Sequence, residues 1–356
     1  MGEGAGTEAE TEAEAGAAPE PAKTGAQAEM LANRLRKRRR HLGKWARRTG
    51  AGLYRLYDRD IPEIPLVLDW YGDAVSGALY ERPYEKDGAG ERLWLSAMKD
   101  AVSAALEIPP DRIILKERRR QRGGAQYGPL GGRGFFRDVR EGGLAFRVNL
   151  SDYLDTGLFP DRRLLRAKIR EEAGGKRVLN LFSYTCSFSV YAAAGGAVSV
   201  DSVDLSRAYL DWGKLNFELN GFKGGEIDPR DLGAGAFART GLPPFRFIRG
   251  DALRFLPEAE RAALRWDIII LDPPTFSNSK KMRGFLDIRR DYRELVRGCL
   301  GLLAPRGKLF VSVNARSFKL DRDAFPGAEI TDLTEKLRDE DFRGKRVPAC
   351  WCLAKP

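Results

Sequence analysis

The stretch Trp266–Lys280, WDIIILDPPTFSNSK, decides the fold of this chain. Its first part is an apolar run rich in isoleucine, which is typical of a strand buried on both faces of a parallel sheet. Pro273 and Pro274 cannot continue the hydrogen-bond ladder, so the chain must leave the sheet there. Because open α/β sheets bind ligands at the carboxyl ends of their strands, we predict that Asp272 and Phe276 lie in a functional site.

The sequence on both sides of this stretch alternates strands with helices. Strands are predicted at 178–182, 198–203, 247–249, 267–271 and 308–313, and helices at 187–194, 206–220 and 288–303. Five strands separated by helices predict an α/β fold with a doubly wound, Rossmann-like parallel sheet. We expect this domain to cover residues 149–356. A small α+β unit with a basic first helix is expected over 30–148, preceded by a disordered acidic tail over 1–29.

Composition disfavours several classes of protein. The 356 residues are 43% hydrophobic, and no apolar run approaches the roughly 20 residues that a membrane helix needs. One histidine, and four cysteines without zinc-finger spacing, predict no metal site. The N-terminus lacks the order of a secretory signal, so we expect a cytoplasmic protein. The net charge is +11, and seven glutamates against one lysine give residues 1–29 a charge of −6, so the remainder carries +17. This excess indicates a polyanionic partner, with nucleic acid foremost.

Residues 34–48 hold nine lysines or arginines and no acid. A sparse apolar stripe at helical spacing accompanies them and predicts a helix with one packed face. Such a helix can be a solvated surface, but its charge exceeds what solubility needs, so we predict contacts with RNA phosphates. The RNA-binding candidates are Arg34, Lys37, Arg38, Arg39, Arg40 and Lys44 in this helix, Arg118, Arg119 and Arg120 before a glycine-rich loop, and Lys280.

An acidic residue follows each of three consecutive predicted strands, namely Asp204, Asp251 and Asp272. A carboxylate in the place of Asp204 holds ribose hydroxyls in Rossmann-like folds, and one in the place of Asp251 can accept a hydrogen bond from an adenine amino group. The polar loop 183–187 leads into a helix N-terminus beside them. The G-x-G-x-x-G fingerprint and the P-loop, which serve phosphate ligands, are both missing. The pattern therefore favours a cationic adenosine ligand without phosphates, S-adenosylmethionine.

Three motifs resemble those of class I S-adenosylmethionine-dependent RNA methyltransferases: Asn180–Thr185, Val203–Ser206 and Asp272–Lys280. The likeness extends from Met30 to the C-terminus and points, within that class, to large-subunit enzymes that make 7-methylguanine in 23S rRNA. It implies a cofactor site of Asp161, Arg163, Phe182, Ser183, Tyr184, Thr185, Cys186, Asp204, Leu205, Ser206, Asp251, Ala252 and Asp272. Cys186 departs from the family, whose loop has glycine there. We expect this chain to lack the guanine-N2 half that the bifunctional enzymes of this kind carry, so a separate guanine-N2 methyltransferase is a candidate partner.

Guanine N7 already carries a lone pair, so its methylation needs no general base and depends on positioning. The positioning candidates are Asp272, Pro273, Pro274, Phe276 and Asn314, although Phe276 could pack in the core and Asn314 could cap a loop. Cytosine-C5 methylation, known in sister proteins with a similar cofactor domain, needs a cysteine adduct. The resemblance implies that this cysteine would come just after the fifth strand, and no cysteine directly follows the strand predicted at 308–313. Adenine-N6 methylation usually has an aromatic residue where Thr275 stands. An RNA-binding assembly factor without catalysis is the alternative from a different class.

Overall fold

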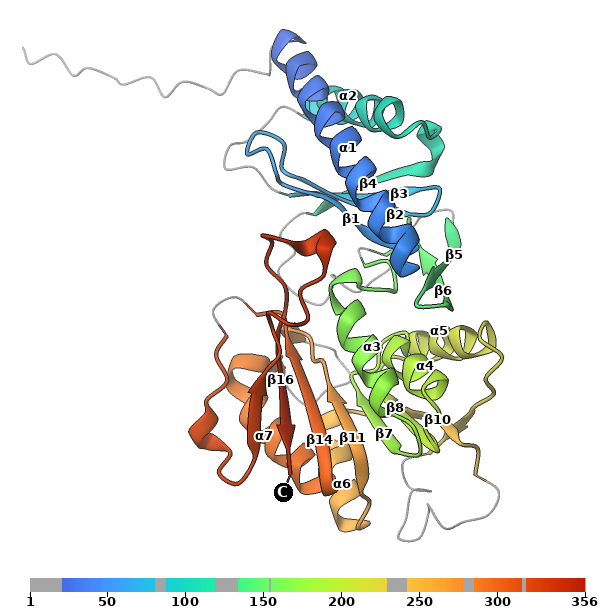
Figure 1. Ribbon diagram of the computed structural model, residues 1–356, viewed down its shortest axis with the longest axis vertical. Coiled ribbons are helices and arrows are strands. Elements are labelled where there is room, and N and C mark those ends of the chain that lie inside the picture. The colour runs from blue at the N-terminus through green and yellow to red at the C-terminus, as the bar shows by residue number, and fades with distance from the viewer. Residues whose placement is uncertain are drawn as a thin grey trace, which may run out of the picture.

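The computed structural model describes residues 21–80, 88–118, 134–153, 155–228, 242–277, 285–315 and 318–355. Figure 1 shows two parts stacked along the long axis: helices over a small sheet in the N-terminal part, and a larger sheet flanked by helices in the C-terminal part. A hairpin of β5 (Phe136–Glu141) and β6 (Leu144–Asn149) lies between them. No helix in these described ranges combines the length and the apolar character of a membrane span.

The N-terminal unit is a four-stranded sheet covered by two helices. Its strands lie in the order β1 (Leu53–Asp58), β2 (Leu66–Tyr71), β3 (Val75–Tyr80) and β4 (Ile113–Arg118). The β1–β2 and β2–β3 pairs are antiparallel and the β3–β4 pair is parallel. The helices are α1 (Pro21–Thr49) and α2 (Gly88–Leu106). Leu31, Leu35 and Leu42 of α1 are fully buried, which confirms the packed face predicted for the basic helix.

The first helix begins earlier than the sequence suggested. α1 starts at Pro21, so the prediction that residues 21–29 belong to a disordered tail is wrong. Gln27 in this stretch is buried, and its side-chain oxygen accepts a 2.6 Å hydrogen bond from the indole of Trp94 on α2. A contact of this kind leaves no apolar periodicity in the sequence, which explains the error. The remainder of the predicted tail, residues 1–20, lies outside the described residues.

The C-terminal unit is built on an eight-stranded sheet. Its order is β15 (Glu329–Asp332), β16 (Ala349–Ala354), β14 (Leu303–Val313), β11 (Trp266–Leu271), β7 (Arg177–Leu181), β8 (Ser199–Asp204), β10 (Phe245–Arg249) and β9 (Gly225–Ile227). The strands from β14 to β9 are parallel, which confirms the five predicted strands and their α/β arrangement. Strands β9, β15 and β16 were not predicted from the sequence. β16 pairs antiparallel with both β14 and β15, so the sheet is mixed.

The central strand β11 is buried on both faces, as predicted. Ile268 and Ile270 point to the face covered by α3 (Arg163–Glu172), α4 (Ser187–Ala194) and α5 (Arg207–Glu218). Ile269 and Leu271 point to the opposite face, where α6 (Ala252–Arg261) and α7 (Ile288–Leu302) pack. The loops at the carboxyl end of β11 are thereby held from both sides.

Arg163, at the start of α3, joins the two units. Its guanidinium donates to the backbone carbonyl of Leu53 at 2.6 Å and contacts the carboxylates of Glu141 and Asp341, each at 3.2 Å. Asp341 lies in a short 3-10 turn, η7 (Glu340–Phe342), between β15 and β16; Figure 1 shows this segment rising from the large sheet towards β1. Burial raises the pKa of Asp341 to about 6, while the positive charge of Arg163 opposes that shift.

Candidate active site at the strand ends

The loop after β7 is bent by three residues in the left-handed region. Phe182, Tyr184 and Cys186 have φ angles of 55°, 50° and 59°, a conformation that costs energy for residues with a side chain. Two hydrogen bonds hold the bend: the Ser183 amide donates to the Val203 carbonyl at 3.0 Å, and the Cys186 amide donates to the Ser183 carbonyl at 2.8 Å. The loop therefore presents a fixed backbone at the carboxyl end of the sheet.

Cys186 occupies the position where the resembling family has glycine, and the fold accommodates it. Its thiol is fully buried against Gly213 of α5, where an added Cβ would lie 2.4 Å from the sulfur. Burial raises the pKa of Cys186 to about 12, so the group stays a neutral thiol. The neighbouring Thr185 hydroxyl donates to the Gly157 carbonyl at 2.5 Å, which ties the loop to the segment before α3.

Asp204, at the end of β8, fastens this loop to the next one. One carboxylate oxygen accepts from the Tyr184 amide at 2.9 Å, and the other accepts from the Ser206 amide at 2.8 Å. Burial raises the pKa of Asp204 to about 6, although these backbone donors oppose the shift. Leu205 lies in the turn between them, and Ser206 caps α5. Each carboxylate oxygen has further lone pairs, so Asp204 can still accept ribose hydroxyls.

Asp251 follows β10 and caps α6, where its side chain accepts from the Leu253 amide at 3.1 Å. Ala252, the next residue, is buried. Asp204 thus ends β8, and Asp251 and Asp272 follow β10 and β11; these strands run parallel in one sheet. The three predicted acids therefore lie at the same side of the sheet, where the carboxyl ends of these strands meet.

Asp272 is held by Arg162, which was not predicted from the sequence. Nε and Nη2 of Arg162 each donate a 3.1 Å hydrogen bond to one oxygen of the Asp272 carboxylate. The same guanidinium pairs with Asp161 at 2.9 Å. Burial alone would lower the pKa of Arg162, but the two acids outweigh it and raise the pKa above its usual value. Arg163, which the resemblance assigned to the cofactor, is engaged in the junction between the units instead. The 3-10 turn η3 (Pro160–Arg162) aims the two adjacent arginines in different directions.

A cavity of about 610 Å³ lies between the two units, beside this ion pair. Its volume falls within the range typical of ligand sites, about 300–1,000 Å³. Strands β1 to β3 and the stretch 155–162 form much of its wall. The charged side chains in its lining are Arg55, Asp58, Arg59, Asp69, Asp155, Asp161, Arg162, Lys345 and Arg346. Oδ1 of Asp161 is buried and has no hydrogen-bond partner among the described residues, so a donor on a ligand would satisfy it.

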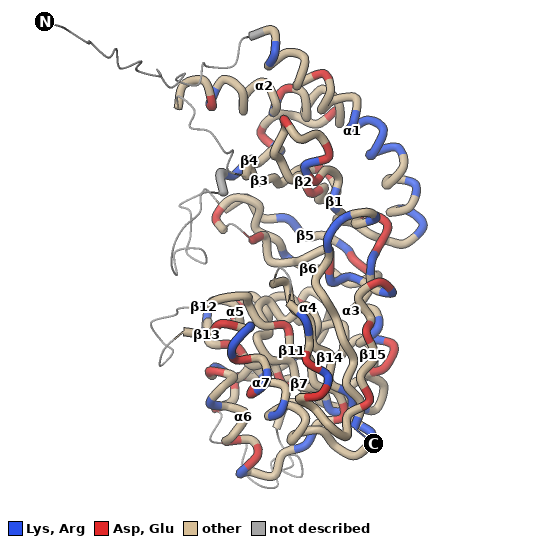
Figure 2. The backbone as a smooth tube through the Cα atoms, turned by 90° about the vertical axis from the view of Figure 1, so that its left-hand side faces the viewer, with Lys and Arg blue, Asp and Glu red and all other residues tan. Residues whose placement is uncertain are grey.

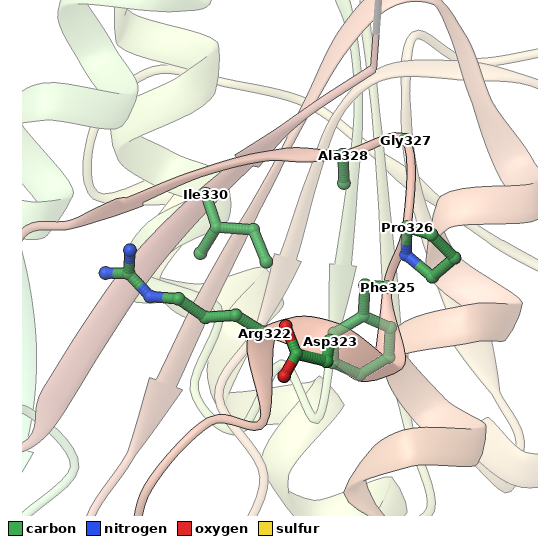
Figure 3. A pocket seen from close by; sticks show the side chains of 7 residues that line it. All are labelled: Arg322, Asp323, Phe325, Pro326, Gly327, Ala328 and Ile330. Atoms are coloured by element: carbon green, nitrogen blue, oxygen red, sulfur yellow. The ribbon is translucent and has the colours of Figure 1, made fainter.

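A second cavity, of about 390 Å³, lies at the turn before β15 and is drawn in Figure 3. A single short segment lines it, with Arg322, Asp323, Phe325, Pro326, Gly327, Ala328 and Ile330. It contains none of the predicted site residues. The strand ends and the cavity between the units therefore form the candidate active site.

Phe276 and Asn314 both reach the surface. Phe276 is 46% exposed on β12 (Phe276–Ser277), which pairs with β13 (Leu286–Asp287), so it does not pack in the core. Asn314 is exposed and lines the cavity between the units. Pro273 is buried and Pro274 half-buried at the turn that follows Asp272.

The predicted RNA-binding residues of α1 divide into two groups. Three point inward: Arg34 pairs with Asp60 at 2.7 Å, Arg38 donates to the carbonyls of Arg55, Leu56 and Asp341, and Arg39 donates to the Tyr54 hydroxyl at 2.9 Å. The other three, Lys37, Arg40 and Lys44, are exposed. Figure 2 shows the basic stretch of α1 on the outside of the N-terminal unit. Arg118 ends β4, and Arg119, Arg120 and Lys280 lie outside the described residues.

The order of the parallel strands and the acids at their ends are those of a class I S-adenosylmethionine-dependent methyltransferase. The chain belongs to this family, because residues 53–325 match the family described as S-adenosylmethionine-dependent methyltransferase. It is 44% identical over 321 residues to ribosomal RNA large subunit methyltransferase K of Neisseria meningitidis serogroup B, covering 90% of this chain and 86% of that protein. It is also 44% identical over 345 residues to methyltransferase K/L of Methylococcus capsulatus, covering 95% of this chain but 44% of the relative.

Solved structures of methyltransferases share the fold. The protein SMU.776, solved in complex with SAH, superposes with a TM-score of 0.68 at 23% identity and covers 92% of this chain and 81% of its own. An S-adenosylmethionine-dependent methyltransferase from Agrobacterium tumefaciens gives a TM-score of 0.55 at 22% identity, covering 82% of this chain and 87% of its own. Both likenesses concern the fold alone.

The residues present fit S-adenosylmethionine. The carboxylates of Asp204 and Asp251 could accept from its hydroxyl and amino groups, and the unpartnered oxygen of Asp161 could accept from its ammonium group. A carboxylate-rich site also suits a cationic sulfonium. Within the described part of the chain, no cluster of three or more His, Cys, Asp or Glu could hold a metal ion.

Proposed function

We propose that this chain methylates 23S ribosomal RNA at N7 of a guanine. The relatives with 44% identity are named as methyltransferases of large-subunit ribosomal RNA. The observation that carries the proposal is the cavity between the basic N-terminal unit and the strand ends, with Arg162 in its wall and Asp272 behind it. A base of RNA bound across the N-terminal unit can enter this cavity. A ribosomal substrate would also place the protein in the cytoplasm.

The residues of the chain then act by binding and positioning. When bound, S-adenosylmethionine supplies an electrophilic methyl group. Asp204, Asp251 and the loop after β7 hold the cofactor, whereas Arg162 fixes the carboxylate of Asp272 at the strand end. Guanine presents N7 and O6 as adjacent acceptors, so the amide of Asn314 in the cavity wall is assigned to donate to O6. Because N7 has a free lone pair, no side chain needs to remove a proton before the transfer.

The cysteines argue against cytosine-C5 methylation, which needs a thiolate that attacks the base. Cys186, Cys299 and Cys350 are buried, and none of the four cysteines, all of which the structure describes, lines the cavity. Burial raises the pKa of each of them, to about 11 for the half-buried Cys352. We expect Cys186→Ser, Cys299→Ala and the double replacement of Cys350 and Cys352 by alanine each to retain turnover.

Capture of the RNA is assigned to the exposed cations of α1. Lys37, Arg40 and Lys44 recur every three or four residues, and Arg47 extends the same row. The row is on the side of the helix opposite the buried leucines, so it can follow a phosphate backbone.

The chain spans less than half of the length of the K/L relatives. We propose a guanine-N2 methyltransferase, acting as a separate protein, as a partner.

The proposal is tested on ribosomal RNA from cells with and without this protein. Cleavage of the RNA after borohydride and aniline marks 7-methylguanine, because the alkylated ring is labile. We expect one cleavage site in 23S rRNA that disappears without the protein. An unchanged pattern of cleavage would argue against N7. Calorimetry with S-adenosylmethionine separates an enzyme from a non-catalytic assembly factor, which would bind RNA without the cofactor.

A further inference from the structure

Two phenylalanine rings stand exposed beside the active site, on the two-stranded hairpin that follows the proline turn. Phe276 is 46% and Phe285 is 49% exposed, although burying a phenylalanine would stabilise the fold. Their ring centroids lie 5.6 Å apart, with planes inclined by 36°. Phe276 comes four residues after Asp272, so their Cα atoms are at most about 14 Å apart. The pair is therefore close to the place where a methyl group is transferred.

Backbone and side-chain contacts hold the two rings. β12 pairs antiparallel with β13, and Phe276 lies opposite Asp287. Arg290, in the first turn of α7, donates to the Phe285 carbonyl at 2.7 Å. Its guanidinium carbon lies 4.4 Å from the centroid of the Phe285 ring. Leu286, next in the chain, is fully buried and anchors the strand. The rings thus form a fixed surface on the outside of the protein.

Two arginines, Arg289 and Arg290, are exposed in the first turn of α7, directly after the hairpin. The acids of this turn and its cap are Asp291 and Asp287. Arg290 donates to the Asp291 carboxylate at 2.6 Å as well as to the Phe285 carbonyl, so it positions the Phe285 ring. Its guanidinium has five N–H donors and is exposed, so it can also donate to an anionic ligand.

We propose that Phe276 and Phe285 form a stacking platform for an unpaired base of the RNA, adjacent to the target nucleotide. The inference rests on the proposed RNA substrate and adds a binding site to it. Any base can stack on an aromatic ring, and a neighbouring arginine contributes to binding single strands. Neither ring lines the cavity that receives the target base. A protein partner fits less well, because the cores of protein interfaces are depleted of charge.

The test measures binding of a short single-stranded RNA that carries 2-aminopurine, whose fluorescence is quenched by stacking. With the full chain, Phe285→Ala should weaken RNA binding roughly 5- to 150-fold, the range for loss of one stacked base, and should reduce the quenching. Phe285→Tyr keeps a ring and should preserve both. Leu93→Ala, at a 73% exposed position on α2, is the matched control and should change neither. The affinity for S-adenosylmethionine should be unchanged in all variants.

Three outcomes decide the matter. If Phe285→Ala binds and quenches like the unmodified chain, while charge reversal of Lys37, Arg40 and Lys44 weakens binding, the platform is overturned but the RNA substrate stands. An equal loss in Leu93→Ala would also overturn the platform. If the unmodified chain binds no RNA, both the proposed substrate and the platform fail.

Discussion

Arg162 and Asp272, 110 residues apart in the chain, face each other through two hydrogen bonds of 3.1 Å. Arg162 comes from the turn before α3 and lines the cavity, whereas Asp272 directly follows the central strand. A bidentate pair fixes orientation as well as charge. The pair therefore fixes the position of the cavity wall relative to the end of the strand, where the cofactor is proposed to bind.

Arg162→Lys tests this arrangement, because lysine keeps the positive charge but lacks the two-pronged geometry. We expect the methylation rate to fall about ten- to a hundredfold, as for other misplacements of reacting groups. The affinity for S-adenosylmethionine in calorimetry should change much less. Arg170→Lys, on α3 but bonded to the Gly142 carbonyl, is the control and should leave the rate intact. Equal rates in both variants would show that the geometry of the pair does not matter.

Asp204 should make cofactor binding depend on pH. Burial raises the pKa of Asp204 to about 6, and the ionised form is the better acceptor for ribose hydroxyls. The affinity should therefore be full above pH 7 and fall as the pH drops through about 6. Asp204→Asn should weaken binding by about 1.5–3 kcal/mol and remove this pH step. Asp211→Asn, exposed on α5, should keep the step, and a step that survives in Asp204→Asn would refute the assignment.

The exposed row of α1 should govern the salt dependence of RNA binding. Reversing Lys37, Arg40 and Lys44 to glutamate should weaken binding and flatten its slope against salt by about 0.7–0.9 for each lost phosphate contact. The inward Arg39 supplies the comparison, because it contacts Tyr54 and lies over the ring of Trp70. Arg39→Gln should lower the free energy of unfolding and leave the slope alone. A slope unmoved by the triple reversal would mean that the row is only solvated.

Arg163 should matter for stability. Arg163→Ala leaves the buried carboxylate of Asp341 without its cation, whereas Glu141 keeps Arg166, and breaking such a buried pair costs about 3–5 kcal/mol. Denaturant unfolding should show this loss. Arg177→Ala removes a more exposed ion pair with Asp267 and should cost at most about 1 kcal/mol. A loss for Arg163→Ala as small as that of the control would contradict the role of the junction.

The sequence predicted the C-terminal fold well where apolar runs and turn signals coincide. The run of isoleucines before Asp272 became β11, and the helix predicted from 187 to 194 has those bounds. Short strands were not predicted, because their formation depends on pairing with neighbouring strands. β16, for example, lies between β14 and β15 and has no distinctive sequence pattern of its own. The start of α1 was not predicted, because a buried glutamine, Gln27, holds it in place rather than an apolar residue at helical spacing.

The candidate site was only partly predictable. The acids at the strand ends could be predicted, because the sequence shows where the strands end. The partner of Asp272 could not be predicted, because Arg162 and Arg163 are adjacent and the direction of each side chain depends on the turn that holds them. The division of the α1 cations into inward and outward groups likewise depends on where Asp60 and Tyr54 lie in the folded unit.

The central claim, guanine-N7 methylation, is tested most directly with purified protein. Unmodified 23S rRNA is incubated with the chain and S-adenosylmethionine, digested, and its nucleosides are identified by mass spectrometry. We predict 7-methylguanosine with the unmodified chain and a strongly reduced amount with Asp272→Ala, whose affinity for the cofactor should be less affected than its rate. 5-Methylcytidine, N6-methyladenosine or no methylated nucleoside as the product would contradict the account.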